Sequence, residues 1–433
     1  NVDHPDNYDF LDYTAKHPGA WPPINTALGS VPGFVEALRR GPDAPWQLQW
    51  KGCYQREVRV SDIWERLVEH AWRCGDPGLF NLAEVNRMNP TYYFETITAS
   101  NPCGEIPLPP YGVCTLSALN LTRFVTLTGP APAFDFAAFV RSVRAGVRFL
   151  DAVLDVNYFP VPRAREVALK SRRIGLSVMG LADAFIMLGL RYGEPEALAF
   201  YERVLKTMRD EAYASSVELA VERGPFPLFD AEKYLAGRFA LTLPAALRAE
   251  IARHGLRNAC LLTQAPTGTT SILAGVSSGI EPVFARSYKR KDRTGVHRVT
   301  HPNAHLPAFV TAHDVPVAGH LQTQRLAQQY IDQSVSKTVN MPREATRADV
   351  AKVFRYALDN GFKGITVFRD GCRDGVLEVE RCSQCGGEII YEERCKKCHA
   401  CGWSDLRCSP CSLGRRRWVA RGLTRQALKS AAM

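Results

Sequence analysis

Residues 101–120 gather side chains whose types and spacing could do chemistry. The stretch reads NPCGEIPLPPYGVCTLSALN and holds two thiols, Cys103 and Cys114. Asn101 and Glu105 flank the first thiol, each two residues away. Prolines at positions 102, 107, 109 and 110 forbid a continuous helix and remove backbone donors, which predicts a stiff loop. A lone Cys in such a loop favours a structural role, but the clustering of Asn, Cys, Glu and a second Cys favours a reactive thiol.

A second group of cysteines lies after residue 381. It contains two CxxC pairs with twelve residues between them, Cys382–Cys385 and Cys398–Cys401. Four thiolates can surround Zn²⁺ in a closed structural site, and glycines beside each pair permit the tight turns. The pattern predicts a zinc ribbon that needs its metal to fold. Cys395 is an alternative ligand, and the role of the later pair, Cys408 and Cys411, stays open.

Residues 258–282 contain an apolar run that leads into the turn PTGTTS. We expect a strand followed by a helix that begins at this turn. Small residues and hydroxyls at a helix start present N–H groups to an anion, aided by the helix dipole. An ordinary capped helix has the same pattern, so the residues alone leave both interpretations open. The candidate phosphate-binding residues are Pro266, Thr267, Gly268, Thr269, Thr270 and Ser271.

The composition is that of an ordinary globular protein. The chain has 433 residues, of which 46% are apolar and 23% charged, and a net charge of +10. This charge suits an anionic ligand such as a nucleotide but does not imply nucleic acid. No apolar run approaches the ~18 residues of a membrane helix, and the N-terminus lacks signal-peptide features. The 13 cysteines therefore indicate a reduced cytoplasm and a metal or redox role.

Hydrophobic periodicity predicts the elements that must position these residues. It indicates helices over 60–74, after 135 and over 201–223, a strand-to-helix unit over 171–185, and a last strand over 361–371. Ser61 and Asp135 are the expected N-caps of the first two helices. Strands and helices that alternate in this way predict an α/β fold.

The loop at 101–120 resembles the radical-site loop of ribonucleotide reductases. It is most similar to the adenosylcobalamin-dependent (class II) enzymes, in which NPCGE is followed by a second Cys eleven residues on, as Cys114 follows Cys103. Residues 265–282 are nearly identical to the substrate-diphosphate loop of that family. The resemblance therefore supports the phosphate interpretation of the PTGTTS turn.

Other segments extend the resemblance over nearly the whole chain. Residues 171–185 match a barrel segment of the family, with Ser177 where Gly is more usual. Residues 335–342 read VSKTVNMP, where class I large subunits carry a tyrosine pair nearby for electron relay. This difference points to class II. The stretch INTALGS, at 24–30, departs from the family pattern near the specificity loop, so control of base selection is not implied.

The resemblance implies the later part of the ten-stranded reductase α/β barrel, with the Cys103 loop as a finger through its centre. A small C-terminal zinc ribbon would follow. We expect the barrel over 1–375 with its N-terminal part missing, the ribbon over 376–411, and a disordered basic tail over 412–433.

The resemblance also implies roles for the loop residues. Cys103 would carry a thiyl radical, Glu105 would accept the proton of the 3′-hydroxyl as general base, and Asn101 would hold that hydroxyl. Cys114 would be half of the dithiol that reduces the substrate, with its partner on an early strand outside this chain. None of the other early cysteines sits in a matching motif, namely Cys53, Cys74 and Cys260. The implied substrate contacts are Asn101, Pro102, Cys103, Gly104, Glu105 and the turn at 266–271.

The implied activity is reduction of ribonucleoside diphosphates to 2′-deoxyribonucleotides. The implied cofactors are adenosylcobalamin and Zn²⁺ in the ribbon. The implied partners are the substrate, a nucleotide effector, a thioredoxin-like reductant, the missing N-terminal half and, as an option, a second copy in a homodimer, with no membrane. We expect the chain alone to be inactive.

Four alternatives stay open. A class I large subunit would need the tyrosine pair, and a glycyl-radical reductase would need a glycine motif near its C-terminus; neither is found. A non-catalytic nucleic-acid-binding protein would use the zinc ribbon and the basic tail. A degenerate pseudo-enzyme would explain the altered segment at 24–30.

Overall fold

The computed structural model describes residues 1–16, 26–292, 295–372, 377–378, 382–387, 389–392, 395–398 and 401. They belong to two compact units. The larger unit consists of residues 1–286 and 301–376, and the smaller of residues 287–300 and 377 onward. The predicted tail at 412–433, with Cys408 and Cys411, lies outside the described residues. Within the described residues, no helix is long and apolar enough to span a membrane.

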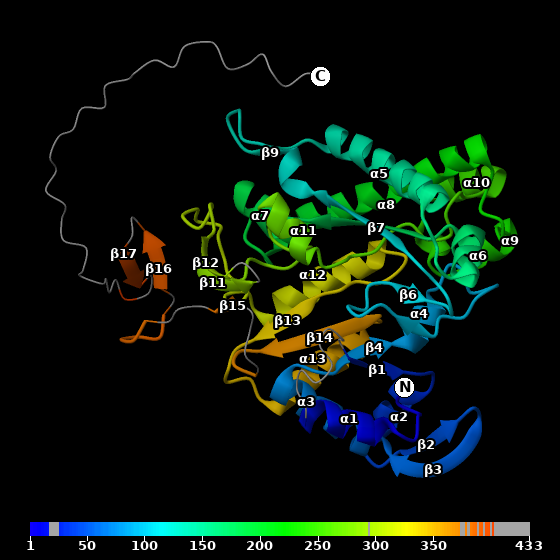
Figure 1. The fold of residues 1–433 in the computed structure, drawn as a ribbon, viewed down its shortest axis with the longest axis horizontal. Coiled ribbons are helices and arrows are strands. Elements are labelled where there is room, and N and C mark those ends of the chain that lie inside the picture. The colour runs from blue at the N-terminus through cyan, green and yellow to red at the C-terminus, as the bar shows by residue number, and fades with distance from the viewer. Residues whose placement is uncertain are drawn as a thin grey trace, which may run out of the picture. The chain divides into compact units, whose positions relative to one another are not determined.

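A four-stranded sheet forms one side of the larger unit (Figure 1). Its order is β1 (Ala27–Ser30), β4 (Gly78–Asn81), β14 (Gly364–Arg369) and β13 (Thr338–Met341). β1 runs parallel to β4, and β13 runs parallel to β14, but β14 runs antiparallel to β4. The sheet thus joins two strands of one direction to two of the other.

A second parallel group continues from this sheet. β7 (Thr115–Asn120) pairs with β10 (Ile174–Met179), and isolated bridges then link Leu176 to Leu262 and Gln264 to Val335. Val335 leads directly into β13, so the two groups share one chain segment. Mixed α/β structure is confirmed. The described strands do not close into a barrel, and β1 and β7 are the last paired strands at either end.

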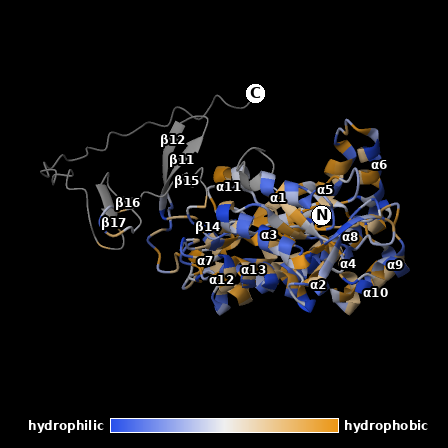
Figure 2. Ribbon diagram, turned by 90° about the horizontal axis from the view of Figure 1, so that it is seen from below, coloured by the Kyte–Doolittle hydropathy of each residue, from blue (hydrophilic) through white to orange (hydrophobic). Residues whose placement is uncertain are grey.

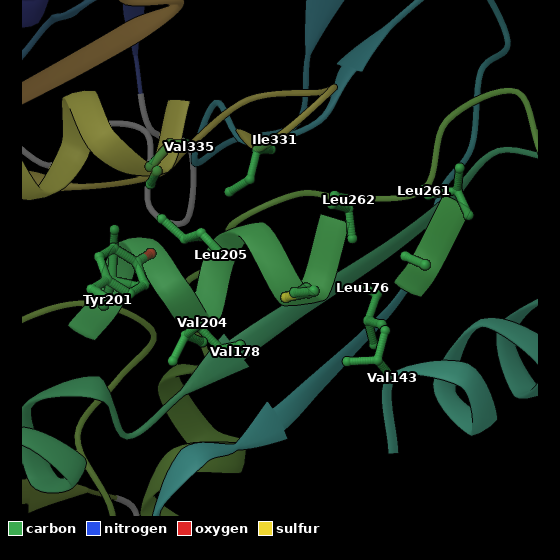
Figure 3. Packing of buried hydrophobic residues seen from close by; sticks show 14 of the residues in the cluster. Val143, Leu176, Val178, Tyr201, Val204, Leu205, Leu261, Leu262, Ile331 and Val335 are labelled. Carbon is green, nitrogen blue, oxygen red and sulfur yellow. The ribbon is translucent and has the colours of Figure 1, made fainter. Parts of the chain in front are cut away.

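Two hydrophobic clusters fix the helices against these strands. Figure 3 shows part of the larger cluster, in which α5 (Phe136–Val156) and α8 (Pro195–Arg223) contribute Val143 and Leu205 beside Leu176 of β10. The other cluster joins α3 (Val60–Cys74), α13 (Arg347–Asp359) and β14. α5 and α8 also carry hydrophilic residues, visible in Figure 2, as helices with one buried face do.

The expected elements form with small differences at their ends. Asp135 caps α5, accepting the Ala138 N–H at 2.9 Å. α8 ends at Gly224, whose φ is +81°. The expected N-cap Ser61 is wrong, because α3 begins one residue earlier, with Arg59 in the cap position, and Ser61 is buried. The expected strand before the PTGTTS turn forms only isolated bridges at Leu262 and Gln264.

Short elements connect this framework. The helices are α1 (Asn7–Lys16), α2 (Phe34–Arg40), α4 (Leu82–Arg87), α6 (Pro162–Ser171), α7 (Leu181–Met187), α9 (Ala231–Ala236), α10 (Ala245–His254), α11 (Gly268–Ala274) and α12 (Val317–Tyr330), with 3-10 turns η1 (Leu121–Phe124) and η2 (Ala240–Thr242). The hairpins are β2 (Pro45–Trp50) with β3 (Cys53–Arg59), β5 (Ala99–Ser100) with β6 (Pro107–Leu108), and β8 (Val125–Thr126) with β9 (Ala133–Phe134).

The smaller unit is antiparallel in its described parts. β11 (Ser287–Asp292) pairs with both β12 (Gly295–Thr300) and β15 (Leu377–Glu378). β16 (Ile389–Glu392) and β17 (Cys395–Cys398) form a separate hairpin. Paired short strands beside CxxC turns are the arrangement that a ribbon requires.

Candidate active site and metal centre

A short hairpin presents the Cys103 loop. β5 and β6 pair antiparallel and enclose residues 101–106. Asn101 closes the loop from both of its ends, because its N–H donates to the Ile106 carbonyl at 3.2 Å and its Oδ1 accepts the Ile106 N–H at 3.0 Å. Gly104, at φ +77°, makes the left-handed turn that brings its N–H to the Asn101 carbonyl at 3.0 Å. Hydrogen bonds as well as prolines therefore stiffen the loop.

Glu105 is a buried carboxyl inside this loop. Its side chain is only 3% exposed, and its Oε2 has no hydrogen-bond partner among the described atoms. Burial raises the pKa of Glu105, while hydrogen bonds from the backbone and from Asn101 oppose that rise. A carboxyl in this state is suited to take a proton from a group bound against it.

Two buried groups tie the loop to the strands behind it. The Glu105 carbonyl accepts the Thr263 hydroxyl at 2.6 Å and the Ser334 N–H at 3.1 Å. Thr263 and Ser334 are both fully buried. Neither residue was predicted from the sequence. For Thr263, a hydroxyl inside the apolar run NACLLTQ could have indicated a buried hydrogen bond. The Cys103 loop is thus anchored to the two buried segments that contain Thr263 and Ser334.

The two predicted thiols lie at different places. Cys103 is in the loop, while Cys114 immediately precedes β7, and both are partly buried and outside any disulfide. Burial raises the pKa of Cys114 to about 12, although Arg173 lowers it. Arg173 lies in the predicted strand-to-helix unit at 171–185, but it was not among the candidate site residues.

Cys260 lies in the same region as Cys114, but the two residues are too far apart to form a disulfide. The register sets Thr115 opposite Ile174, and Leu176 opposite Leu262, so Cys260 lies two strands away from the start of β7. Two strand spacings amount to about 10 Å, beyond the ~7 Å between Cα atoms that a disulfide spans. The expectation that Cys260 is not the dithiol partner agrees with this geometry.

The PTGTTS turn forms the start of α11, and three of its four hydroxyls have partners within or next to the turn. Thr267 accepts the Gly279 N–H at 2.9 Å, and the Ser271 hydroxyl donates to the Gly268 carbonyl at 2.9 Å. Thr270 likewise donates to the Thr267 carbonyl at 2.8 Å. Thr269 is exposed, and the first N–H groups of the helix lack intrahelical partners. Anion binding by this turn stays a prediction.

A buried Asp–His pair braces this turn. Asp183 accepts the Ser277 N–H at 2.6 Å and faces His301 Nε2 at 2.8 Å. Burial acts to raise the pKa of Asp183, but the hydrogen bonds from His301 and Ser277 outweigh it and leave that pKa lowered. Asp183 therefore stays ionised and holds residue 277 in place. The sequence analysis did not identify either partner.

The four predicted metal ligands come together in the smaller unit. The Sγ atoms of Cys382, Cys385, Cys398 and Cys401 all lie within 4.8 Å of one another. Cys382 and Cys401 are 3.8 Å apart at sulfur, and Cys385 and Cys398 are 3.4 Å apart. Tetrahedral Zn²⁺ with ~2.3 Å bonds to sulfur needs sulfurs about 3.8 Å apart, so this donor set fits the ion. The side chain of Cys395 lies outside the described residues.

Comparison with known proteins defines the class of the chain. The family model of the ribonucleotide reductase barrel domain matches residues 1–368. The chain therefore belongs to the ribonucleotide reductase barrel-domain family, which confirms the resemblance expected from the Cys103 loop.

Its relatives include reductases of two kinds. The chain is 34% identical over 403 residues to a vitamin B12-dependent ribonucleoside-diphosphate reductase of Thermoplasma acidophilum, covering 86% of this chain and 50% of the relative. A protein of the same name from Mycobacterium tuberculosis is 33% identical over 87% of this chain and 56% of its own length. A ribonucleoside-diphosphate reductase large subunit of Caenorhabditis elegans is 30% identical over 58% of the chain and 34% of its own length. The chain thus spans about half the length of the B12-dependent relatives.

Proposed function

We propose that this chain carries the radical site of a ribonucleoside-diphosphate reductase, which converts ribonucleotides to 2′-deoxyribonucleotides. The observation that carries the proposal is the Cys103 loop. In this loop a partly buried thiol lies in the sequence between Asn101 and the buried Glu105, whose Oε2 has no hydrogen-bond partner among the described atoms. Thr263 and Ser334 anchor the loop by donating hydrogen bonds to the Glu105 carbonyl.

The proposed reaction begins with a thiyl radical at Cys103. This radical takes the hydrogen atom from the 3′ carbon of the ribose, which leaves a carbon radical there. Glu105 takes the proton of the 3′-hydroxyl, and the amide of Asn101 holds that oxygen. A rigid loop places these groups before substrate arrives, so little entropy is lost when they act.

Cys114 then takes part in the reduction. Its thiol gives a proton to the leaving 2′-hydroxyl, which departs as water. Two electrons pass from Cys114 and a second thiol to the sugar, so that the two sulfurs form a disulfide. The 3′ hydrogen returns from Cys103, and the thiyl radical is restored. We propose that the second thiol lies in the part of the relatives' length that this chain does not match.

We propose adenosylcobalamin as the cofactor because three relatives that match 86–87% of this chain are named vitamin B12-dependent. When bound, this cofactor supplies an organic radical able to take a hydrogen atom from a thiol. Cys103 is suited to lose a hydrogen atom to this radical, because it is only partly buried and lies in the loop between β5 and β6.

We propose that the diphosphate of the substrate binds at the start of α11. The Glu105 carbonyl accepts the hydroxyl of Thr263, and Thr267, the N-cap of α11, comes four residues after Thr263. Four extended residues span at most ~14 Å, so a ribose at the loop and a phosphate at the turn are within the reach of one nucleotide. Gly268, Thr269 and Thr270 are exposed there.

The remaining proposals concern the whole assembly. β1 and β7 would border the strands that complete a ten-stranded barrel, with the Cys103 loop at its centre. A thioredoxin-like reductant would reduce the disulfide, and a nucleotide effector would regulate the enzyme in the cytoplasm. The domain limits 1–375 and 376–411 stay predictions. In the ribbon, Cys382, Cys385, Cys398 and Cys401 would bind Zn²⁺.

Complementation tests the proposed function. The purified chain, adenosylcobalamin, dithiothreitol and a nucleoside diphosphate should give no deoxynucleotide. Turnover should appear when the unmatched N-terminal part of the Thermoplasma acidophilum relative is added as a separate polypeptide. A Cys103→Ser chain should give none, and Glu105→Gln should lower the rate by about 10²-fold.

The control is the same relative divided at the matching boundary. If its two pieces restore turnover together and this chain cannot replace the C-terminal piece, the proposal is wrong. Omission of adenosylcobalamin distinguishes the cobalamin-dependent form from a class I large subunit. Turnover by the chain alone would contradict the expectation that it is incomplete.

A further inference from the structure

The Cys114 thiol lies in a closely packed polar surrounding. Its S–H has two acceptors at 3.8 Å, the Thr115 carbonyl and Oε1 of Gln333. Gly175 makes room for the sulfur, because a Cβ there would lie 3.1 Å from Cys114 Sγ. The sulfur therefore lies against the backbone at the start of β10, where the missing side chain of Gly175 leaves space for it.

The Gln333 side chain has a single orientation in this surrounding. Its Nε2 donates to the Ile174 carbonyl at 2.8 Å and to the Leu262 carbonyl at 3.2 Å. Because both carbonyls are acceptors, the amide nitrogen must face them, and Oε1 must face the other way. Oε1 is thus turned toward Cys114 and toward Arg173, whose Nη1 donates to it at 3.4 Å.

Arg173 is a buried cation that the reaction sequence above does not use. It is 3% exposed and donates to Glu95, to Thr91 and, at 3.1 Å, to the buried Cys260 sulfur. The charged and titratable groups around Cys114 are Arg173, which immediately precedes β10, Glu105 from the loop, and Asp332 and Cys260 behind the strands. Glu95 pairs with Arg173, and a second buried cation, Lys363, donates to the carbonyls of Asp332 and Gln333. Arg173 is the cation that stands one hydrogen bond away from the amide that touches the thiol.

We propose that Arg173 and Gln333 are positioning residues for Cys114: Gln333 orients the thiol, and the charge of Arg173 stabilises its thiolate. This role deepens the proposed function and rests on it, since a dithiol must be re-formed from its disulfide in every turnover. The thiolate is the reactive form in thiol–disulfide exchange. Burial alone would keep the Cys114 sulfur protonated and slow, and a fixed neighbouring cation opposes that effect.

The test measures the alkylation of Cys114 in the purified chain. Iodoacetamide labelling from pH 7 to 11 is quantified at each cysteine by peptide mass spectrometry, with the exposed Cys53 as internal reference. Arg173→Gln should slow Cys114 about tenfold relative to Cys53, since loss of a nearby opposite charge raises a pKa by ~1 unit or more. Arg173→Lys should retain the rate to within about threefold.

Arg173→Gln leaves the buried carboxylate of Glu95 without its partner, so this variant can fail to fold. Changes at Glu95 therefore provide a second test. Glu95→Gln should speed the labelling of Cys114, because it leaves the Arg173 charge uncompensated. The double change Glu95→Gln with Arg173→Gln removes both charges and should slow it. If folded variants label Cys114 at the unmodified rate, the inference is overturned. Because labelling needs no turnover, a chain that fails as a reductase can still confirm or refute this role.

Discussion

At the scale of single residues, the candidate site is marked by a buried polar atom that has no hydrogen-bond partner among the described residues. Glu105 Oε2 is such a group, and it lies beside the thiol that the spacing NPCGE had singled out. Asn101 is not wholly available to a ligand, because its Oδ1 is bound to Ile106. The same side chain thus shapes the loop, and its hydrogen bond to Glu105 opposes the rise in the pKa of that carboxyl.

Glu105 should make stability depend on pH. Burial raises its pKa, so the folded protein keeps this proton at pH values where the unfolded chain has lost it. The free energy of unfolding should then fall as pH rises above the ordinary Glu pKa. Glu105→Gln should be more stable than the unmodified chain by about 1 kcal/mol at pH 7, with a smaller gain at pH 4. Urea unfolding at both values measures this; an equal gain at both would contradict it.

At the scale of elements, the Cys103 loop takes its position from segments that follow it in sequence by more than 150 residues. Thr263 lies between β10 and β13, and its hydroxyl donates to the carbonyl of Glu105, which comes 158 residues earlier in the chain. Prolines make this loop stiff, and the hydrogen bond from Thr263 fixes its position relative to the rest of the larger unit.

Thr263→Val keeps the shape of this side chain and removes its hydrogen bond. The variant should lose about 1 kcal/mol of stability, because the Glu105 carbonyl keeps only the Ser334 N–H. Amide hydrogen exchange at residues 101–106 should become faster than in the unmodified chain. Thr263→Ser retains the hydroxyl and serves as the control. Unchanged exchange in the loop of Thr263→Val would show that Thr263 does not anchor it.

The N-cap of α5 offers a test that is independent of the site. Asp135 accepts the Ala138 N–H at 2.9 Å at the start of a 21-residue helix. Asp135→Ala should destabilise the larger unit by about 1 kcal/mol, whereas Asp135→Asn should cost only a few tenths. Chemical denaturation compares the two. Equal effects would mean that the cap does not hold the helix end.

At the scale of the whole molecule, the chain contains two compact units with different sources of stability. The larger one has two large hydrophobic clusters and a third small one, while the described part of the smaller one has short strands and four converging cysteines. A short module built around four converging cysteines is expected to depend on its metal.

Metal removal should therefore act on one unit only. The purified chain should contain about one Zn²⁺, and Cys385→Ser should lower that content sharply, since one of four ligands is lost. A strong chelator should expose the ribbon at 382–401 to proteolysis and leave the main thermal transition unchanged. Cys53→Ser, at an exposed Cys outside the cluster, is the control. Full metal content in Cys385→Ser would contradict the assigned ligand set.

The sequence by itself determined the chemistry that depends on neighbours along the chain. The Asn–Cys–Glu spacing, the two CxxC pairs and the helical stripes are local patterns, and short-range geometry carries their meaning. The family followed from the same patterns. The residue-level error at Ser61 was of the same local kind, since a cap can shift by two residues, here to Arg59, without changing the type of the element.

Only the tertiary structure decided which distant groups surround those patterns. Thr263, Ser334, Arg173 and Gln333 meet the two thiol segments because parallel pairing aligns segments that are remote in the sequence side by side. In the PTGTTS turn, packing against residues 278–279 likewise occupies the Thr267 hydroxyl, which accepts the Gly279 N–H. Burial and partnership of a side chain are properties of the folded whole, and no window of sequence contains them.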